Sequence, residues 1–261
     1  MDGMETQPLK GRVALVTGVS RRTGIGFAIA NRLAIFGADL FIHHYAPYDA
    51  QQPWGADPDG VSAILDELQA HGRRVNHLEA DFSDPKAPRH TLLNAVQAFG
   101  HIDILVANHA YSTMGALEEL TARDIDMHLV VNVRGTLLLV SEFAAQHDGR
   151  AGGRVIMLTS GQHEGPMPGE LAYVASKAAI HGLTRSLSAH LVPRGITVNT
   201  VNPGATDTGY ATEEIYKAVL AHEPQGRWGQ PEDAARLITW LATDDAAWIT
   251  GQVINSTGGG P

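Results

Sequence analysis

Short β-branched and apolar runs alternate along the chain with longer segments whose apolar residues recur at helical spacing. Several of the helical segments end at a glycine, as at Gly37 and Gly100. Ile104 to Ala107 is apolar throughout, which is typical of a parallel strand covered on both faces. The pattern predicts strands over 12–17, 39–43, 75–78, 104–107, 153–159, 197–201 and 252–255, and helices over 26–36, 61–70, 91–99, 125–145, 173–191 and 231–242. This βαβ alternation predicts an α/β fold with one doubly wound, Rossmann-type domain, its parallel sheet carrying helices on both faces.

We expect one domain over residues 1–261, because no internal repeat or interdomain linker is visible and the length suits a single large core. Within it, residues 1–9 are predicted to be an N-terminal tail. Residues 47–60 hold three prolines and Trp54 without a clear period, which indicates an exposed loop. Residues 205–228 are assigned to the substrate side of the domain.

Composition excludes several classes of site. The formal net charge of -9 gives no electrostatic footprint for nucleic acid or an anionic membrane. The chain has no cysteine, so disulfides and thiolate metal sites are excluded, and its thirteen histidines form no His-x-x-x-His pair with a partnering acid. The N-terminus lacks signal-peptide features, and the longest apolar runs fall far below the roughly 20 residues of a membrane helix. We therefore expect a cytoplasmic protein with no metal, nucleic-acid or membrane partner.

A glycine-rich turn joins the first predicted strand to the first predicted helix. Gly18, Gly24 and Gly26 would bring backbone N–H groups and a helix N-terminus close to a pyrophosphate. A glycine pair alone is weak evidence, and the bland alternative is an ordinary strand-to-helix turn. Residues 41–46 contain no acid to bind the ribose hydroxyls, whereas Arg21 and Arg22 offer charge for a 2′-phosphate. The turn thus predicts NADP(H) in preference to NAD(H).

Tyr173 and Lys177 are four residues apart, which places both on one face of the predicted helix. A lysine ammonium one turn away would favour the phenolate and lower the phenol pKa from about 10. The alternative is an amphipathic pair with a solvated lysine. Ser160 favours the catalytic interpretation of the pair. It follows a predicted strand, and sheets of this kind bind ligands at the carboxyl ends of their strands.

These motifs occur in an order that resembles the short-chain dehydrogenase/reductase family over nearly the whole chain. The resemblance rests on the glycine turn, Asp81, Ala107-Asn108-His109-Ala110, Val131-Asn132-Val133, Ser160, Tyr173-Val174-Ala175-Ser176-Lys177, Asn202-Pro203-Gly204, and the tail from Pro231 through Thr250-Gly251 to Gly258-Gly259. It is closest to members like the 3-oxoacyl carrier-protein reductases.

The resemblance implies roles for individual residues. Tyr173 would be the general acid or base, Ser160 would hold the substrate oxygen, Lys177 would tune Tyr173 and bind the nicotinamide ribose, and Asn132 would carry a water relay to Lys177. Together with the glycine turn, the resemblance predicts these cofactor contacts: Gly18, Ser20, Arg21, Arg22, Gly24, Ile25, Gly26, His44, Tyr45, Asp81, Phe82, Asn108, Ala110, Tyr173, Lys177, Pro203, Gly204, Thr206 and Thr208.

Two departures from the family pattern stand out. Five residues separate Gly18 from Gly24, two more than usual, so which arginine reaches the phosphate stays open. The family's usual Asn-Asn-Ala-Gly is here Ala107-Asn108-His109-Ala110, which places an imidazole where a small residue is usual.

The sequence therefore predicts an oxidoreductase that transfers a hydride between NADP(H) and a carbonyl or secondary alcohol. The alternatives are a non-catalytic dinucleotide-binding regulator, an epimerase or dehydratase, and, as a narrower substrate, a 3-oxoacyl thioester. Candidate substrate walls are His109, Tyr111, His163, Glu164, Met167, Pro168, Leu171, Tyr210 and Trp228. The resemblance also implies a homotetramer with interfaces on 125–145 and 173–191.

Overall fold

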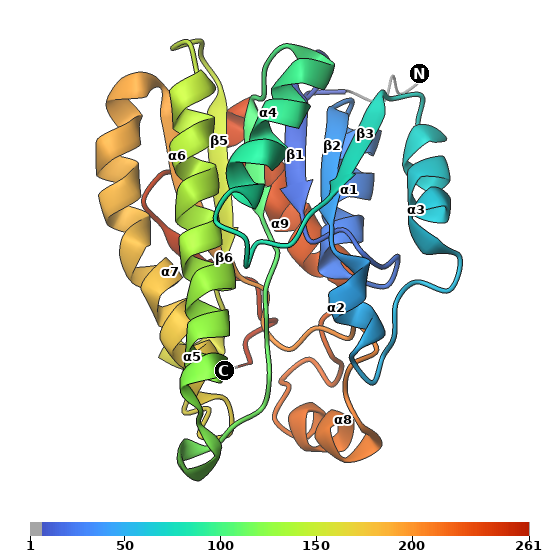
Figure 1. Ribbon diagram of the computed structural model, residues 1–261, viewed down its shortest axis with the longest axis vertical. Helices are drawn as coiled ribbons and strands as arrows, with labels where there is room; N and C mark the ends of the chain where they lie inside the picture. Colours follow the sequence, from blue (N-terminus) through green and yellow to red (C-terminus); the bar gives the residue numbers. More distant parts are fainter. Residues whose placement is uncertain (1–6, 261) are drawn as a thin grey trace.

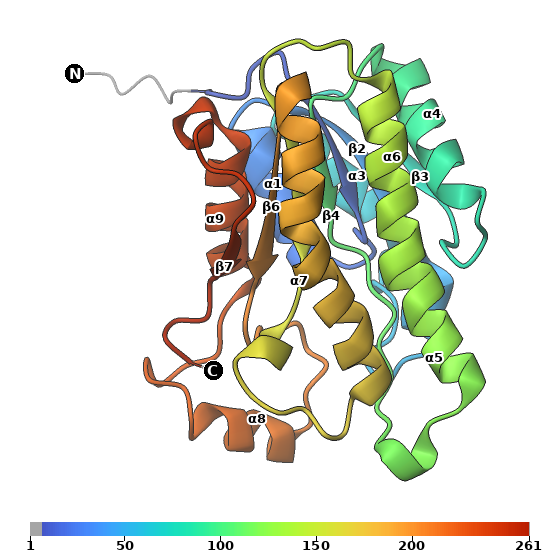
Figure 2. The same cartoon turned by 90° about the vertical axis from the view of Figure 1, so that its left-hand side faces the viewer.

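A computed structural model describes residues 7–260 of the chain and arranges them in three layers (Figures 1 and 2). All seven strands are parallel and hydrogen-bonded in the order β3-β2-β1-β4-β5-β6-β7. They are β1 (Val13–Thr17), β2 (Asp39–His44), β3 (Val75–Glu79), β4 (Ile104–Ala107), β5 (Gly153–Leu158), β6 (Ile196–Asn202) and β7 (Val253–Asn255). The predicted doubly wound parallel sheet is confirmed.

Helices cover both faces of this sheet. They are α1 (Ile25–Ile35), α2 (Ala46–Ala50), α3 (Gly60–Gln69), α4 (Ala87–Phe99), α5 (Ala122–His128), α6 (Thr136–Gln146), α7 (Leu171–Leu191), α8 (Glu213–Leu220) and α9 (Pro231–Ala242). Along β1, Ala14 and Val16 pack with α1, α3 and α9, while Val13 and Leu15 pack with α4, α6 and α7. Alternate side chains thus enter two separate cores, which explains why the central strands β1 and β4 are apolar along almost their whole length.

Three expectations about single segments need correction. Leu9, placed in the N-terminal tail, is fully buried and its N–H donates to Phe36 O; residues 1–6 of that tail lie outside the described residues. The segment 47–60 is not simply an exposed loop, because it contains most of α2 and buries Asp49. The helix predicted over 125–145 is interrupted by a π-helical turn, Leu129–Gly135. The first two corrections arise from contacts with segments far away in the sequence, which local patterns do not reveal.

The helical run Ala122–Gln146, made of α5, the π-helical turn and α6, is long and apolar enough to cross a membrane by length and composition alone. In the fold it packs against α4 and α7, and Leu139, Val140 and Phe143 belong to the core beside the sheet. Its apolar character is therefore explained by burial within the α/β layers.

Candidate active site

Because all seven strands are parallel, their carboxyl ends share one edge of the sheet, and the predicted site residues gather there. The glycine turn follows β1, Asn108 follows β4, Ser160 follows β5 and Pro203 follows β6. In Figures 1 and 2, α2 and α8 lie beyond this edge, at the lower end of the molecule. The edge has two halves, which we name after the functions predicted for them. The cofactor half is the glycine turn with the end of β2, and the catalytic half is the group formed by Ser160, Tyr173 and Lys177.

The glycine turn is packed so closely that side chains are excluded at two positions. Gly18 has φ +74°, and a Cβ on it would lie 2.9 Å from Asn108 Nδ2. A Cβ on Gly26 would lie 2.3 Å from Gly18 O. Gly24 ends the turn just before Ile25, the first residue of α1. This bare backbone at a helix N-terminus is a cradle that fits a dinucleotide pyrophosphate.

Asn108 fixes the turn from the neighbouring strand. Its Nδ2 donates to Thr17 O (2.9 Å) and to Gly18 O (3.2 Å). The Thr17 hydroxyl accepts from the backbone N–H groups of Asn108 (3.1 Å) and His109 (3.2 Å). The structure therefore gives the Asn108 side chain a role in shaping the cradle. Ala110, the next cofactor contact predicted on this segment, is half-buried two residues farther on.

Both arginines of the turn are already engaged by protein groups. Arg22 donates from Nε to Asp57 Oδ2 (3.1 Å) and from Nη2 to Asp57 Oδ1 (2.8 Å), and it also pairs with Asp59 and Glu67. Arg21 forms an ion pair from Nε with Asp49 (3.1 Å) and donates from Nη1 to Thr208 O (3.0 Å). Carboxylates brought in by residues 49–67 therefore engage both guanidinium groups, and the contact of either arginine with a 2′-phosphate stays a prediction.

The end of β2 carries two buried imidazoles where NAD-binding sites often carry an acid. His43 Nδ1 accepts from Gly18 N–H (3.3 Å), and its Nε2 faces Ala80 O (2.8 Å), so the neutral Nε2–H tautomer satisfies both partners. Burial lowers the pKa of His43 to about 4, and burial also lowers the pKa of His44 to about 4. Tyr45 and Ser20 are half-buried beside them, joined by Tyr45 N–H and Ser20 Oγ (3.1 Å).

Two aromatic neighbours of β2 are more buried than the sequence indicated. The Phe82 ring stacks on His43 with 4.0 Å between centroids and meets His109 edge-on, so its side chain is a core element. His109 is also buried, with Nδ1 at 2.7 Å from Thr17 Oγ1 and Nε2 at 3.2 Å from Val131 O. His109 is therefore not a substrate wall. Asp81 accepts from Ser83 N–H (2.8 Å), so its carboxylate forms a turn after β3, and its contact with the cofactor stays a prediction.

The catalytic half brings Tyr173 and Lys177 together on α7, beside Ser160. Lys177 is almost fully buried, its Nζ donates to Leu158 O (3.0 Å) and lies 5.6 Å from the Tyr173 ring centroid. Burial lowers the pKa of Lys177 to about 8. The pKa of Tyr173 is raised above its usual value by burial, and a hydrogen-bonding interaction with the Ser160 side chain opposes this. Burial of the phenol thus opposes the lowering of its pKa that was predicted from Lys177, and this effect of Lys177 stays a prediction.

Asn132 lies in the π-helical turn and is fully engaged. Its Oδ1 accepts from Tyr111 N–H (2.7 Å), and its Nδ2 donates to Tyr111 O (2.9 Å) and Ser176 Oγ (2.9 Å). Ser176 precedes Lys177 on α7, so Asn132 ties the loop after β4 to the helix of the catalytic pair. The π-helical turn (Leu129–Gly135) contains this side chain, as such turns often do at functional sites. The water relay itself stays a prediction.

The segment after β6 faces the glycine turn. Thr206 is buried, and its Oγ1 donates to Pro203 O and Gly204 O (both 3.2 Å). Its side chain is therefore engaged within its own loop. Thr208 is half-buried, and its carbonyl is the acceptor of Arg21. Trp228, expected to line the substrate site, is fully buried and stacks on Tyr216, so it is a core residue instead.

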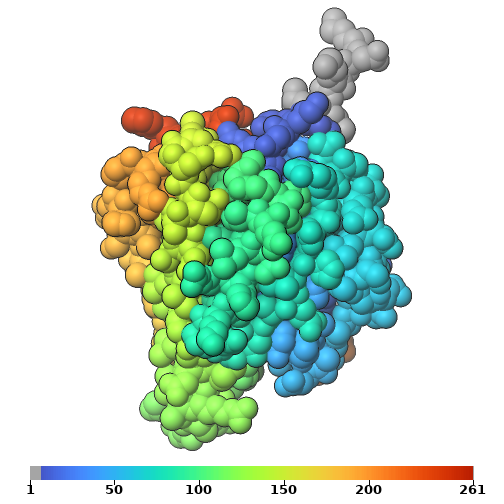
Figure 3. All heavy atoms as spheres, turned by 45° about the horizontal axis from the view of Figure 1, so that its top comes forward, coloured from blue at the N-terminus to red at the C-terminus, as the bar shows by residue number. Residues whose placement is uncertain are grey.

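The remaining wall candidates differ in exposure. Tyr111, Met167 and Leu171 are half-buried, and Tyr210, Pro168 and Glu164 are exposed. His163 contacts Asn255 Oδ1 (3.2 Å) and Glu164, which is another wall candidate. The segment around residues 114–119, coloured green, projects at the lower end of Figure 3 and exposes Met114 and Leu117.

Sequence reasoning missed Tyr48, Asp49 and Asp57, which contact the site from residues 46–59. The Tyr48 hydroxyl donates to Ser112 O (2.9 Å) and accepts from Ser112 N–H (3.1 Å). The available signal was composition: two arginines in the turn and acids at 49, 57 and 59 are complementary in charge.

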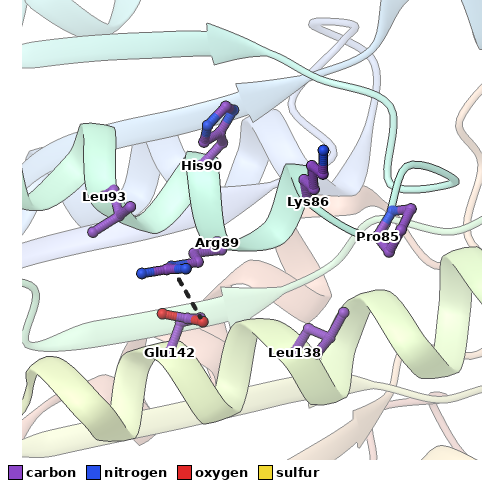
Figure 4. A pocket seen from close by; sticks show the side chains of 7 residues that line it. All are labelled: Pro85, Lys86, Arg89, His90, Leu93, Leu138 and Glu142. Atoms are coloured by element: carbon purple, nitrogen blue, oxygen red, sulfur yellow. Dashed lines mark ion pairs between the residues drawn. The ribbon is translucent and has the colours of Figure 1, made fainter.

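Two hollows are found on the surface, one apart from this edge and one beside it. A surface groove between α4 and α6 is lined by Lys86, Arg89, His90 and Glu142, with 3.9 Å between Arg89 Nε and Glu142 Oε1 (Figure 4). A second hollow adjoins the segment after β6 and is lined by Pro203, Ala205 and Asn255. Among residues 7–260, no three histidine or acidic side chains gather in a way that could hold a metal ion.

Comparison with known proteins adds three kinds of match. A family model described as enoyl-(acyl carrier protein) reductase matches residues 18–260. The chain is 42% identical over 250 residues to YjdA of Bacillus subtilis, an uncharacterized oxidoreductase, covering 95% of this chain and 96% of that one. It is 34% identical over 271 residues to the hydroxynaphthalene reductase-like protein Arp2 of Metarhizium anisopliae, covering 96% and 95%. A short chain dehydrogenase from Burkholderia cenocepacia, solved with NADP, superposes with a TM-score of 0.86 at 35% identity, covering 97% and 98%.

Proposed function

The chain belongs to the short-chain dehydrogenase/reductase family, and from this premise we propose that it transfers a hydride between NADP(H) and a carbonyl or secondary alcohol, with Tyr173 as the proton donor or acceptor. The observation that carries the proposal is the position of Tyr173, Ser160 and Lys177 at the same strand-end edge as the glycine cradle. A pure dinucleotide binder needs the cradle but has no use for a buried phenol beside a serine and a lysine.

The preference for NADP(H) is supported by two observations. β2 ends in His43 and His44, without the carboxylate that binds the ribose hydroxyls in NAD sites. The Burkholderia protein of the same fold was solved with NADP. Arg21 and Arg22 support the preference less than the sequence indicated, since carboxylates already hold them.

Bound NADP(H) would supply the hydride for reduction or accept it in oxidation. In reduction, the Ser160 hydroxyl holds the carbonyl oxygen and the Tyr173 hydroxyl gives its proton to that oxygen as the hydride reaches carbon. A raised phenol pKa keeps Tyr173 protonated at neutral pH, which suits the reductive direction. Lys177 would donate to the nicotinamide ribose. When Lys177 is charged it also favours the phenolate that remains.

Two substrate classes are each favoured by one observation. The family model's description, enoyl-(acyl carrier protein) reductase, favours an acyl thioester, and within that class the carbonyl chemistry proposed here requires a 3-oxoacyl group. The likeness to a hydroxynaphthalene reductase-like protein, together with the Tyr48, Tyr111 and Tyr210 rings near the site, favours a flat aromatic ketone. A homotetramer and a cytoplasmic location complete the proposal; light scattering during size exclusion tests the former.

The direct test is Tyr173→Phe assayed with NADPH against ketones, quinones and 3-oxoacyl thioesters. We expect kcat to fall about 10²- to 10⁴-fold, the usual contribution of a positioned proton donor, while NADPH affinity is retained. Tyr216→Phe is the matched control, because its ring stacks on Trp228 away from the site. Near-native turnover by Tyr173→Phe would remove Tyr173 from the mechanism, and absence of NADPH binding by the native chain would refute the proposed function.

A further inference from the structure

Residues 46–59, which we call the strap, run from the end of β2 across the strand-end edge and touch three other loops. Tyr48 bonds to both backbone groups of Ser112 in the loop after β4. Asp49 pairs with Arg21 of the glycine turn. Trp54 meets Tyr210 of the segment after β6, with 6.4 Å between ring centroids. One short segment therefore connects the loops that follow β1, β2, β4 and β6.

Arg21 is the centre of these contacts. Besides its bond to Asp49, it donates from Nη1 to Thr208 O (3.0 Å), and its guanidinium lies 5.5 Å from the Trp54 ring centroid. Trp54 Nε1 donates to Asp49 Oδ1 (3.0 Å), so the carboxylate holds the arginine and the indole together. The Arg21 and Asp49 side chains are 14% and 12% exposed, which makes this pair much less screened than a surface ion pair.

Arg22 anchors the far end of the strap. Its pair with Asp57 uses Nε and Nη2, and the Asp57 side chain is 4% exposed. Asp57 also accepts from the Arg22 backbone N–H (2.9 Å), so the lengthened turn and the strap are joined by main chain and side chain at once. The two additional residues of the turn thus have a structural use, because they present two arginines to the strap.

This arrangement places a constraint on any dinucleotide in the cradle. The glycine turn lies on one side of the cradle and the segment after β6 lies on the other. Arg21 belongs to the turn, and its side chain donates to Thr208 O in the segment after β6, so it links the two sides. We expect a ligand held between the two segments to dissociate faster when the bond between Arg21 and Thr208 O and the ion pair between Arg21 and Asp49 are broken. Protein groups face Nε and Nη1 of Arg21, so two of its three nitrogens are used to join the turn to the strap and to the segment after β6.

We propose that Arg21 is a positioning residue that fastens the strap across the bound dinucleotide and so controls its release, for NADP(H) and NAD(H) alike. This inference rests on the proposed function, since it requires a dinucleotide in the cradle. It assigns to the lengthened turn a task that differs from phosphate recognition.

The test is the dissociation rate of NADPH and of NADH, measured by stopped-flow fluorescence on the full chain. Arg21→Gln should raise both rates about tenfold, and Asp49→Asn should raise them by a smaller factor, because it leaves the bond from Arg21 to Thr208 O in place. The double variant should raise the rates no further than Arg21→Gln, because Asp49 acts through its pair with Arg21. Tyr48→Phe releases the strap from Ser112 and should also raise both rates by a smaller factor while the charged pair stays intact. Arg74→Gln, which removes the exposed pair with Asp39, is the matched control and should leave the rates unchanged.

Two results would overturn the inference while leaving the proposed function in place. A loss of affinity confined to NADPH in Arg21→Gln would make Arg21 a phosphate-binding residue. Native release rates in Arg21→Gln, Asp49→Asn and Tyr48→Phe, each shown to be folded by circular dichroism, would mean that the strap does not control release. If the native chain binds neither cofactor, the proposed function fails and the strap inference fails with it.

Discussion

The two halves of the strand-end edge are built from different kinds of contact. The catalytic half holds a buried lysine, a tyrosine and Asn132, and two of them bond to main-chain atoms: Lys177 to Leu158 O, and Asn132 to both backbone groups of Tyr111. The cofactor half combines buried neutral imidazoles with ion pairs between segments distant in sequence, such as Arg21 with Asp49. The first half depends on local backbone geometry and the second on side chains that meet across the fold.

The same physical cause, desolvation of a basic group, lowers a pKa in each half. It therefore changes the free energy of unfolding in two separate pH ranges. Burial lowers the pKa of His43 to about 4 in the cofactor half and that of Lys177 to about 8 in the catalytic half. In each window the unfolded chain binds more protons than the folded chain, so the free energy of unfolding rises with pH. The halves can therefore be probed separately, one below pH 6.5 and one above pH 8.

The largest expected effect is acid destabilisation of the cofactor half. As pH falls from 6.5 toward 4, His43 should lose about 3 kcal/mol of stabilisation, since each pKa unit corresponds to about 1.4 kcal/mol. His44, with its pKa also lowered to about 4, adds to this loss. Protonation of His43 Nδ1 would also set an N–H group against Gly18 N–H and disturb the cradle. Urea unfolding of the native chain and of His43→Gln at pH 7 and pH 4.5 measures the difference.

His222→Gln, on the exposed surface, is the control for that experiment and should unfold with the native pH profile. Carboxylates contribute acid destabilisation in every variant, so the informative quantity is the native value minus the variant value. If that difference stays constant from pH 7 to 4.5, His43 does not stabilise the fold as a neutral imidazole.

A comparable change is expected at the alkaline end from the catalytic half. Between pH 8 and 10.5 the native chain should gain up to about 3 kcal/mol relative to Lys177→Met, because deprotonation relieves the cost of burying the ammonium. Methionine also leaves Leu158 O without its donor, which lowers the stability of the variant at every pH and does not change the pH-dependent part of the difference. Thermal or urea unfolding at pH 7 and pH 9.5 measures it, with the exposed Lys217→Met as control. Parallel profiles for the native and Lys177→Met chains would contradict the burial argument.

The sequence predicted the catalytic half well because its geometry follows from short-range rules. A spacing of four on one helix places Tyr173 beside Lys177, and a strand end places Ser160 at the ligand edge. The seven strands and the doubly wound topology followed from periodicity in the same way. What these rules could not give was the direction of the Tyr173 pKa shift, since desolvation depends on the burial that only the folded chain defines.

The cofactor half was predicted less well because its side chains are arranged by distant partners. Arg22 reaches a carboxylate 35 positions away, and Arg21 reaches the carbonyl of a residue 187 positions away. Phe82, His109 and Trp228 carried aromatic or imidazole groups that matched a ligand site by position, and packing buried all three. Local sequence patterns contain no information about such contacts. A helix that becomes π-helical around Asn132 is a similar case, since periodicity predicted only that the segment is helical.

The smallest expected effect tests whether the catalytic half is held by side-chain bonds to the backbone. Asn132→Ala removes three buried hydrogen bonds and leaves both backbone groups of Tyr111 unpaired, so we expect a loss of about 2 kcal/mol and a lower kcat as the loop after β4 loosens from α7. Ser176→Ala removes the bond from Asn132 Nδ2 and the bond that Ser176 Oγ donates to Tyr173 O, and it should cost about 1 kcal/mol. Urea unfolding gives both values. Equal losses in the two variants would show that the two bonds to Tyr111 contribute no more than the single bond from Ser176 to Tyr173 O, and the catalytic half would then depend on packing as much as on the hydrogen bonds of Asn132.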